Sequence, residues 1–406
     1  MMMSGGRQMA PLLSLGLVLL LALGGCSWFD DKDEVRVPVQ LVDFKQEVEI
    51  ASRWSVSLGG GAEDSTIKLV PGLVAGRIYA AAADGNVLAV DTDTGKVIWK
   101  QEIIDLYPEA ERGIAFADGI DAITGGVGVG QSLVVVGTAA GEVVALNQAD
   151  GSLAWRAKTT SEVLAPPQIF NGRVFAQSVD GKIAAFDVKT GERLWIYSTS
   201  IPSLTLRGTS NMVVDKDFVI AAFANGRVVM LDQARGLVGF EQRVAVAQGQ
   251  SDLERLVDVD GQMLVQGGLL YAVSYQGNLV AIDLAANGRI RWSREASSIV
   301  GMGAGFGNIY VGLEDSRLLA IGTENNRDIW ETDALLYRDI TTPKTVGSYV
   351  AVGDFAGFIH LIAQADGRFV GRKKLDGAGL GAPVVVDGNR FYVITNSGRL
   401  MALEVR

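Results

Sequence analysis

The sequence predicts an all-β fold, an eight-bladed β-propeller of four-stranded antiparallel blades. Three observations lead to this prediction. A segment ending in tryptophan recurs along the 406 residues, a turn residue precedes each copy, and no stretch shows a sustained helical period. The copies are spaced by about 40 residues, which is the length of one propeller blade.

The recurring segment combines an apolar strand, a polar turn and a final aromatic residue. Its clear copies are Ala89–Trp99 (AVDTDTGKVIW), Ala145–Trp155, Ala185–Trp195, Ala281–Trp292 and Ala320–Trp330, and its weaker copies are Met230–Phe240 and Leu361–Gly371. A small turn residue comes before each copy or its equivalent, at Gly85, Gly141, Gly181, Gly226, Gly277, Ser316, Gly357 and Gly398.

The first unit shows how four strands fit into one repeat. Arg77–Ala83 and Val87–Asp91 are predicted as strands joined by a tight turn, in which Gly85 supplies the positive φ. Lys96–Ile103 is predicted as the outer strand. The apolar stretch Ile67–Leu73 is predicted as the innermost strand.

The two ends of the chain are predicted to close the ring. The last unit, Ala382–Arg406, has no outer strand of its own, whereas Ile50–Leu58 contains Trp54 outside any unit. We therefore expect the N-terminal strand to complete the last blade, which removes open sheet edges between blades. We expect Trp54 and its counterparts in the repeats to pack over the neighbouring blade. Stacking on a carbohydrate or quinone is the alternative, but the regular spacing favours packing.

The N-terminus has the features of an export signal. Arg7 precedes the apolar stretch Ala10–Leu23, which is too short to span a bilayer. The following Leu-Gly-Gly-Cys resembles the lipobox of bacterial lipoproteins, in which the cysteine is lipidated after cleavage. This resemblance implies lipidation of Cys26, and Ser27 in place of aspartate implies export to the outer membrane. An ordinary signal peptide followed by a cysteine is the alternative.

These features divide the chain into three parts. Residues 1–25 are predicted to be the lipoprotein signal peptide, residues 26–45 the lipidated cysteine and a flexible tether, and residues 46–406 a single propeller. The tether prediction depends on the charged, apolar-poor segment Asp30–Glu34.

The composition argues against several classes of function. The formal net charge of −10, without any run of Lys or Arg, argues against nucleic-acid binding. Cys26 is the only cysteine and His360 the only histidine, so thiol nucleophiles, disulfides and zinc sites are not expected. A single histidine between apolar neighbours is expected to be structural. We therefore predict no catalytic residues, no cofactor and no metal.

Two glycine-rich segments need an explanation other than phosphate binding. Neither Gly125–Gly130 (GGVGVG) nor Gly301–Gly307 (GMGAGFG) carries the Gly-Lys-Ser/Thr of a phosphate loop. Both are predicted to be close-packed innermost strands.

The first repeat resembles the tryptophan docking motif of quinoprotein alcohol dehydrogenases. Ala89, Asp91, Thr94, Gly95 and Trp99 match that motif. The vicinal disulfide of those enzymes cannot form here, and those enzymes are longer. The motif thus supports the fold rather than the activity, and a periplasmic, pyrroloquinoline-quinone-dependent dehydrogenase remains the alternative function.

From Cys26 to Arg406 the chain also resembles the BamB family, lipoproteins of the outer-membrane β-barrel assembly machinery. The segments carrying this resemblance are Ile201–Gly208 (IPSLTLRG), Leu253–Asp260 (LERLVDVD), Arg338–Pro343 (RDITTP) and Val352–Gly357 (VGDFAG).

The resemblance implies a non-enzymatic scaffold that is lipid-anchored at the periplasmic face of the outer membrane. Its implied partners are the POTRA domains of BamA and the rest of that complex, and it would assist folding and insertion of outer-membrane proteins. Direct contact with nascent outer-membrane proteins stays open. The implied partner-binding residues are Leu204, Leu206, Arg207, Asp258 and Asp260.

The spacing of the repeats supports a binding surface near these residues. The links after Trp99, Trp195 and Phe240 are longer than the others, and in four-stranded blades such links emerge on one face. Long loops on one face of a rigid scaffold are common binding sites. We expect Leu204 and Leu206 to point the same way, and their burial beneath the loop is the alternative.

Overall fold

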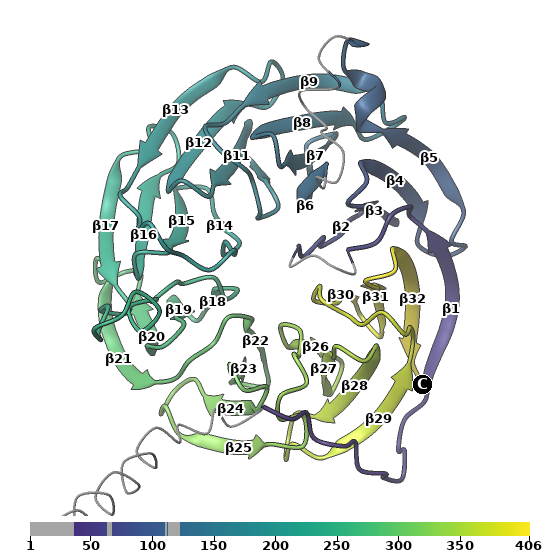
Figure 1. Ribbon diagram of the computed structural model, residues 1–406, viewed down its shortest axis with the longest axis vertical. Coiled ribbons are helices and arrows are strands. Elements are labelled where there is room, and N and C mark those ends of the chain that lie inside the picture. Colours follow the sequence, from purple (N-terminus) through teal and green to yellow (C-terminus); the bar gives the residue numbers. More distant parts are fainter. Residues whose placement is uncertain (1–35, 63–66, 110–111, 113–121) are drawn as a thin grey trace, which may run out of the picture. The chain divides into compact units, whose positions relative to one another are not determined.

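The computed structural model describes residues 36–62, 67–109, 112 and 122–406. Within this part of the chain, the strands form eight four-stranded antiparallel sheets, and Figure 1 shows these sheets as blades around one axis. They belong to one compact unit, Pro38–Arg406. The all-β, eight-bladed prediction is confirmed. Among the described residues, none of the helices is long and apolar enough to cross a bilayer.

Each blade is a meander that runs from the axis outward. The first four blades contain β2 (Gly72–Val74), β3 (Arg77–Ala81), β4 (Asn86–Asp91) and β5 (Val97–Glu102); β6 (Ile123–Gly130), β7 (Leu133–Thr138), β8 (Glu142–Asn147) and β9 (Leu153–Lys158); β10 (Gln168–Phe170), β11 (Arg173–Ser178), β12 (Lys182–Asp187) and β13 (Arg193–Ser198); β14 (Val213–Val214), β15 (Phe218–Phe223), β16 (Arg227–Asp232) and β17 (Val238–Arg243). The next three contain β18 (Leu264–Gln266), β19 (Leu269–Val273), β20 (Asn278–Asp283) and β21 (Arg289–Glu295); β22 (Gly301–Gly305), β23 (Asn308–Gly312), β24 (Leu318–Gly322) and β25 (Asp328–Thr332); β26 (Lys344–Val346), β27 (Tyr349–Gly353), β28 (Phe358–Ala363) and β29 (Phe369–Lys374). The eighth contains β30 (Val385–Asp387), β31 (Arg390–Ile394), β32 (Arg399–Val405) and β1 (Ile50–Ser57), and the short helix η1 (Ile103–Leu106) follows β5.

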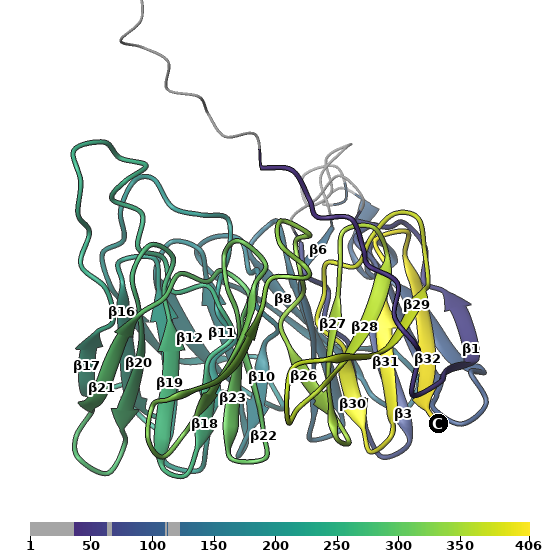
Figure 2. The same cartoon turned by 90° about the horizontal axis from the view of Figure 1, so that it is seen from below.

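Where the structure describes them, the links between blades lie on one face of the ring, here called the link face. Each outer strand ends beside the turn between the second and third strands of its own blade. The N–H of Ile103 donates to the carbonyl of Gly85 at 2.9 Å, and the N–H of Val244 donates to that of Gly226 at 2.8 Å. In Figure 2 the link face is uppermost, and its longest teal and green loops rise above β16.

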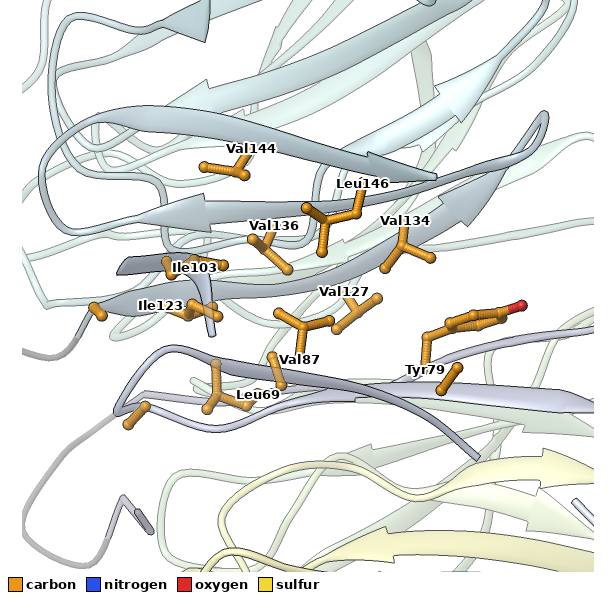
Figure 3. Close-up of a cluster of buried hydrophobic side chains, with 14 of the residues drawn as sticks. Leu69, Tyr79, Val87, Ile103, Ile123, Val127, Val134, Val136, Val144 and Leu146 are labelled. Carbon is orange, nitrogen blue, oxygen red and sulfur yellow. The ribbon is translucent and has the colours of Figure 1, made fainter. Parts of the chain in front are cut away.

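The hydrophobic core is divided among the interfaces between neighbouring blades. Figure 3 shows the cluster between the first and second blades, where Tyr79 and Val87 of one blade face Val127, Val134 and Leu146 of the next. Comparable clusters join the other neighbouring pairs of blades. Burial of apolar area therefore joins each blade to its neighbours, and the ring is stabilised as a whole.

The repeated tryptophans pack as the sequence predicts. Trp99 donates its indole N–H to the carbonyl of Gln148 at 3.2 Å, and its ring covers Gly151 in the next blade. A Cβ at Gly151 would lie 2.6 Å from that ring, and its φ of 76° also favours glycine. The equivalent pairs are Trp54 on Gly95, Trp155 on Gly191, Trp195 on Gly236, Phe240 on Gly288 and Trp330 on Gly367.

The N-terminal strand closes the ring as predicted. β1 pairs antiparallel with β32 and forms the outer edge of the eighth blade. Trp54 of β1 then donates its indole N–H to the carbonyl of Thr92 in the first blade, at 2.9 Å. The two ends of the chain therefore share one sheet, and that sheet contacts the first blade through a tryptophan.

The predicted innermost strand Ile67–Leu73 is wrong in its extent. The strand is β2, Gly72–Val74, while Ile67 and Leu69 are buried in the cluster between the first two blades. The chain turns at Lys68, whose carbonyl accepts the N–H of Val70 at 2.9 Å. This turn places apolar side chains between blades instead of along a straight strand beside the axis.

The predicted tether extends too far along the chain. Residues 38–49, here called the strap, belong to the compact unit. The N–H of Val39 donates to the carbonyl of Leu336 at 3.1 Å, and Phe44 lies 5.8 Å from the ring of Phe369. The alternating apolar residues of the strap explain this packing. The predicted signal peptide and Cys26 lie outside the described residues.

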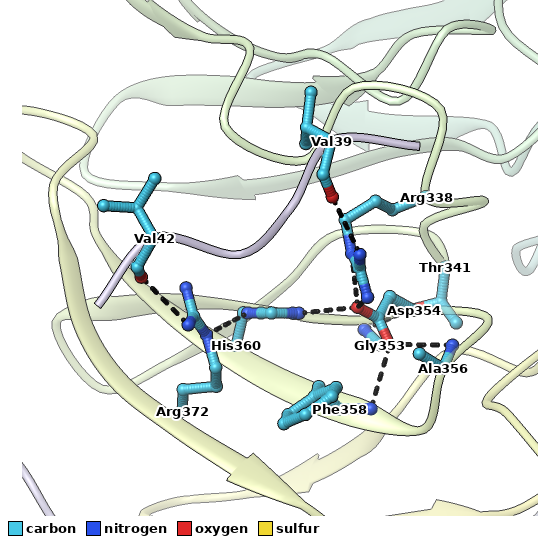
Figure 4. Close-up of polar contacts among 10 residues, drawn as sticks. All are labelled: Val39, Val42, Arg338, Thr341, Gly353, Asp354, Ala356, Phe358, His360 and Arg372. Carbon is cyan, nitrogen blue, oxygen red and sulfur yellow. Dashed lines mark hydrogen bonds and ion pairs between the residues drawn. The ribbon is translucent and has the colours of Figure 1, made fainter. Parts of the chain in front are cut away.

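A buried polar network holds the strap on the seventh blade (Figure 4). Arg338 and Arg372 donate to the carbonyls of Val39 and Val42, each at 3.0 Å. Arg372 also donates to Nδ1 of His360 at 3.3 Å, and Nε2 of His360 lies 3.1 Å from the carboxylate of Asp354. Burial lowers the pKa of His360, so its neutral form accepts from Arg372 and donates to Asp354. His360 thus has a structural role in this network.

Candidate docking site

Two long links of the link face are joined by hydrogen bonds. The link 199–212 follows β13, and the link 244–263 follows β17. They contain the two segments that carry the resemblance, here called the first loop (Ile201–Gly208) and the second loop (Leu253–Asp260). The hydroxyl of Ser210 donates to the carbonyl of Gly261 at 2.9 Å. The structure therefore brings together two motifs that are distant in sequence.

Asp258 lies beneath the first loop and is not a surface charge. Its side chain is fully buried, and its Oδ2 accepts the backbone N–H of Leu206. Its other carboxylate oxygen is buried without a hydrogen-bond partner. Burial raises the pKa of Asp258 to about 6, although the bond from Leu206 acts to lower it. Direct pairing with a basic group of a partner is therefore not open to Asp258 in this conformation.

Asp260 packs against the end of the first loop. Its carboxylate occupies the space that a Cβ at Gly208 would need, so any larger residue at this position would displace the side chain of Asp260. Burial, together with the neighbouring charge of Asp258, raises the pKa of Asp260 to about 7, and Lys68 partly opposes this shift. The buried Asp258 and the half-buried Asp260 thus form an acidic pair that supports the loop.

The first loop presents its three candidate residues differently. Leu204 is 42% exposed, while Leu206 is half-buried and lines a hollow of about 220 Å³ together with Ile201 and Phe223. The backbone bends at Leu204 and Arg207. The two leucines are therefore not equally exposed, contrary to the expectation that they point the same way. Leu204 is the apolar residue available to a partner.

Arg207 is directed toward a third link. Its guanidinium donates to the carboxylate of Glu162 at 2.7 Å, and its side chain is 48% exposed. Glu162 lies in the link between the second and third blades. An exposed pair of this kind contributes about 0–1 kcal/mol to stability, so Arg207 remains available for a charge-assisted bond to a partner. The ion pair of Arg207 is thus with Glu162 and not with Asp258 or Asp260.

The tip of the second loop is an exposed turn on a buried base. Glu254 accepts the backbone N–H groups of Gln250 and Ser251 at 2.7 and 3.1 Å, and Leu253 at this tip is 66% exposed. Val257 and Val259 are buried below it. Leu253 lies in the quoted motif but is not among the predicted site residues, and Glu162 lies in no motif that would have indicated its role.

The described residues contain no group of three His, Cys, Asp or Glu side chains that could hold a metal ion. The candidate site instead consists of Leu204, Arg207 and Leu253 at the surface, and Leu206, Asp258 and Asp260 beneath it. Exposed apolar residues beside an arginine can bind a protein surface.

Comparison with known proteins places the chain in a family. The model of the family described as outer membrane protein assembly factor BamB matches residues 83–332. The curated BamB of Pseudomonas aeruginosa is 42% identical over 390 residues, covering 96% of this chain and 98% of the relative. The chain belongs to the BamB family of outer membrane protein assembly factors. This confirms the resemblance found in the repeats and loops.

Solved structures agree with this assignment. The crystal structure of BamB from Moraxella catarrhalis has a TM-score of 0.77 and 27% identity, covering 88% of this chain and all of that chain. The quinohemoprotein alcohol dehydrogenase from Comamonas testosteroni has a TM-score of 0.68 at 17% identity, covering 87% of this chain and 76% of that chain. The second likeness concerns the fold alone. The protein is thus an assembly factor rather than the quinone-dependent enzyme considered as the alternative.

Proposed function

We propose that this protein is a lipid-anchored scaffold of the outer-membrane β-barrel assembly machinery, and that its two joined loops dock onto the POTRA domains of BamA. The observation that carries the docking proposal is the bond from the backbone of Leu206 to the buried carboxylate of Asp258. A loop held before a partner arrives loses less conformational entropy on binding.

The proposal divides the five candidate residues into two roles. Leu204 and Arg207 contact the partner, and the exposed Leu253 extends the same surface. Asp258 and Asp260 position the first loop from below. Leu206 contributes with its backbone and with its side chain. Its N–H donates to Asp258, and its side chain lines the hollow under the loop.

The anchor completes the proposed arrangement. Lipidation of Cys26 would hold the protein at the periplasmic face of the outer membrane, since each buried CH₂ of a lipid chain contributes about 0.8 kcal/mol. The BamB names of the relatives support membership of the Bam complex. Contact with the rest of that complex and with nascent outer-membrane proteins belongs to the same proposal.

Binding of a purified POTRA fragment of BamA tests the docking surface. Leu204→Ala and Arg207→Ala are each expected to weaken binding by at least about tenfold, the effect of losing a contact of roughly 1.4 kcal/mol or more. Ile329→Ala is the matched control, because Ile329 is 46% exposed on β25 in a distant blade. It should bind like the unaltered protein.

Circular dichroism and melting temperature should be unchanged in all three variants. Normal binding by a folded Leu204→Ala/Arg207→Ala double variant would place the partner site elsewhere on the ring.

A further inference from the structure

A cavity lies beside the axis of the propeller, lined mainly by the innermost strands of the fifth to eighth blades. Its volume is about 390 Å³, within the range of small-molecule sites. Its walls come from the innermost strands and the residues just before them, and the half-buried Val70, Leu264 and Val385 contribute apolar surface. It shares Asn211 and Gln262 with a neighbouring cavity that reaches Arg207 and Gly208.

One cation faces this apolar cavity. Lys344, the first residue of β26, is half-buried, and its ammonium group donates to the side-chain oxygen of Gln262 at 2.6 Å. Among the described residues, no carboxylate forms an ion pair with Lys344, whereas Lys182 lies 2.6 Å from Asp180. Burial lowers the pKa of Lys344 to about 8, so the group is mostly protonated at neutral pH.

A half-buried cation without an anionic partner becomes more favourable when a ligand compensates its charge. Lys68 differs, because it lines the neighbouring cavity, where Asp260 partly compensates its charge. The axial cavity therefore offers a single uncompensated positive charge beside an apolar wall. A singly charged anion with an apolar chain matches both features, whereas phosphate would need more cationic groups.

We propose that the axial cavity binds a small amphipathic carboxylate, with its carboxylate on Lys344 and its chain along Val70, Leu264 and Val385, in front of the buried methionines Met263 and Met302. Gln262, already bonded to Lys344, orients the ammonium group. The site lies in the interior of the ring, so the inference does not depend on the proposed docking of the loops.

Methyl NMR of the methionines tests this site directly. The protein would be the mature chain with Cys26→Ser, labelled at the methionine methyl groups, and the probe would be sodium octanoate at pH 7. We expect saturable shifts of the Met263 and Met302 signals. Met230 and Met401, which lie in strands away from the axis, should not shift. Acetate lacks the chain and octanol lacks the charge, so both should bind more weakly.

Two substitutions of Lys344 distinguish the effect of its charge on binding from an effect on folding. Lys344→Gln should weaken octanoate binding by at least about tenfold, because a charge-assisted bond is lost, while Lys344→Arg should retain binding. Lys216→Gln is the matched control, since the Lys216 side chain is 76% exposed. Absence of saturable shifts, equal binding of octanol, or unchanged binding by a folded Lys344→Gln variant would overturn the proposal.

Discussion

At neutral pH the protein should be less stable than its Asp258→Asn variant, because the charged carboxylate of Asp258 is buried. Asp258→Asn removes the charge but keeps an oxygen that can accept the N–H of Leu206. The side chain has no exposed surface, so the cost of burying the charge is not relieved by solvent. We therefore expect this variant to fold more stably than the original protein while keeping the first loop in place.

The size of this effect follows from the pKa of Asp258. A value of about 6 in place of 3.8 corresponds to about 3 kcal/mol of lost stability once the group is ionised in both states. The raised pKa means that the folded protein binds this proton more tightly than the unfolded chain. The loss is small near pH 4, about half complete at pH 5, and complete above about pH 6. For a propeller of this size, 3 kcal/mol corresponds to roughly 4 °C in melting temperature.

Melting curves at pH 5 and pH 8 provide the assay. The advantage of Asp258→Asn should be about twice as large at pH 8 as at pH 5. Asp252→Asn is the matched control, because Asp252 is exposed in the same link, and it should change neither curve. An Asp258→Asn variant that is less stable than the original protein at pH 8, or a stability gain that does not depend on pH, would contradict this prediction.

Two further predictions concern the N-terminal part of the chain. Cys26→Ser should release the protein from membranes on fractionation, since the proposed anchor is lost, and unchanged membrane association would contradict the lipobox interpretation. Deleting residues 27–58 removes β1 and leaves the edge of β32 unpaired, so this variant should melt lower or aggregate. Deleting only residues 27–37, which precede the compact unit, should leave the melting temperature unchanged, and equal stability of the two deletions would argue against closure by β1.

The blade architecture was predictable because its signal is local and repeated. A tryptophan such as Trp99 and a turn glycine such as Gly151 recur together, since the ring of one occupies the space left by the missing side chain of the other. The extent of the innermost strand and of the tether was not predictable in the same way. Ile67 and Phe44 find their partners in other blades or strands, and no local pattern identifies those partners.

The candidate site shows the same limit. The motifs containing Leu204 and Asp258 were recognisable, and so was the placement of long links on one face. The resemblance alone implied that Asp258 and Asp260 are partner-binding residues. Their positions beneath the first loop, and the raised pKa values of both carboxylates, depend on contacts with Leu206 and Gly208 in another link.

By itself, the sequence determined the repeat, the number of blades, the closing strand and the family to which the chain belongs. Each of these follows from residue types at regular spacings or in contiguous motifs. Only the tertiary structure decided which side chains face solvent and which charges lack partners, as for Leu204 and Lys344. Exposure and charge compensation depend on neighbours from distant parts of the chain, and closing the ring determines which of these neighbours meet.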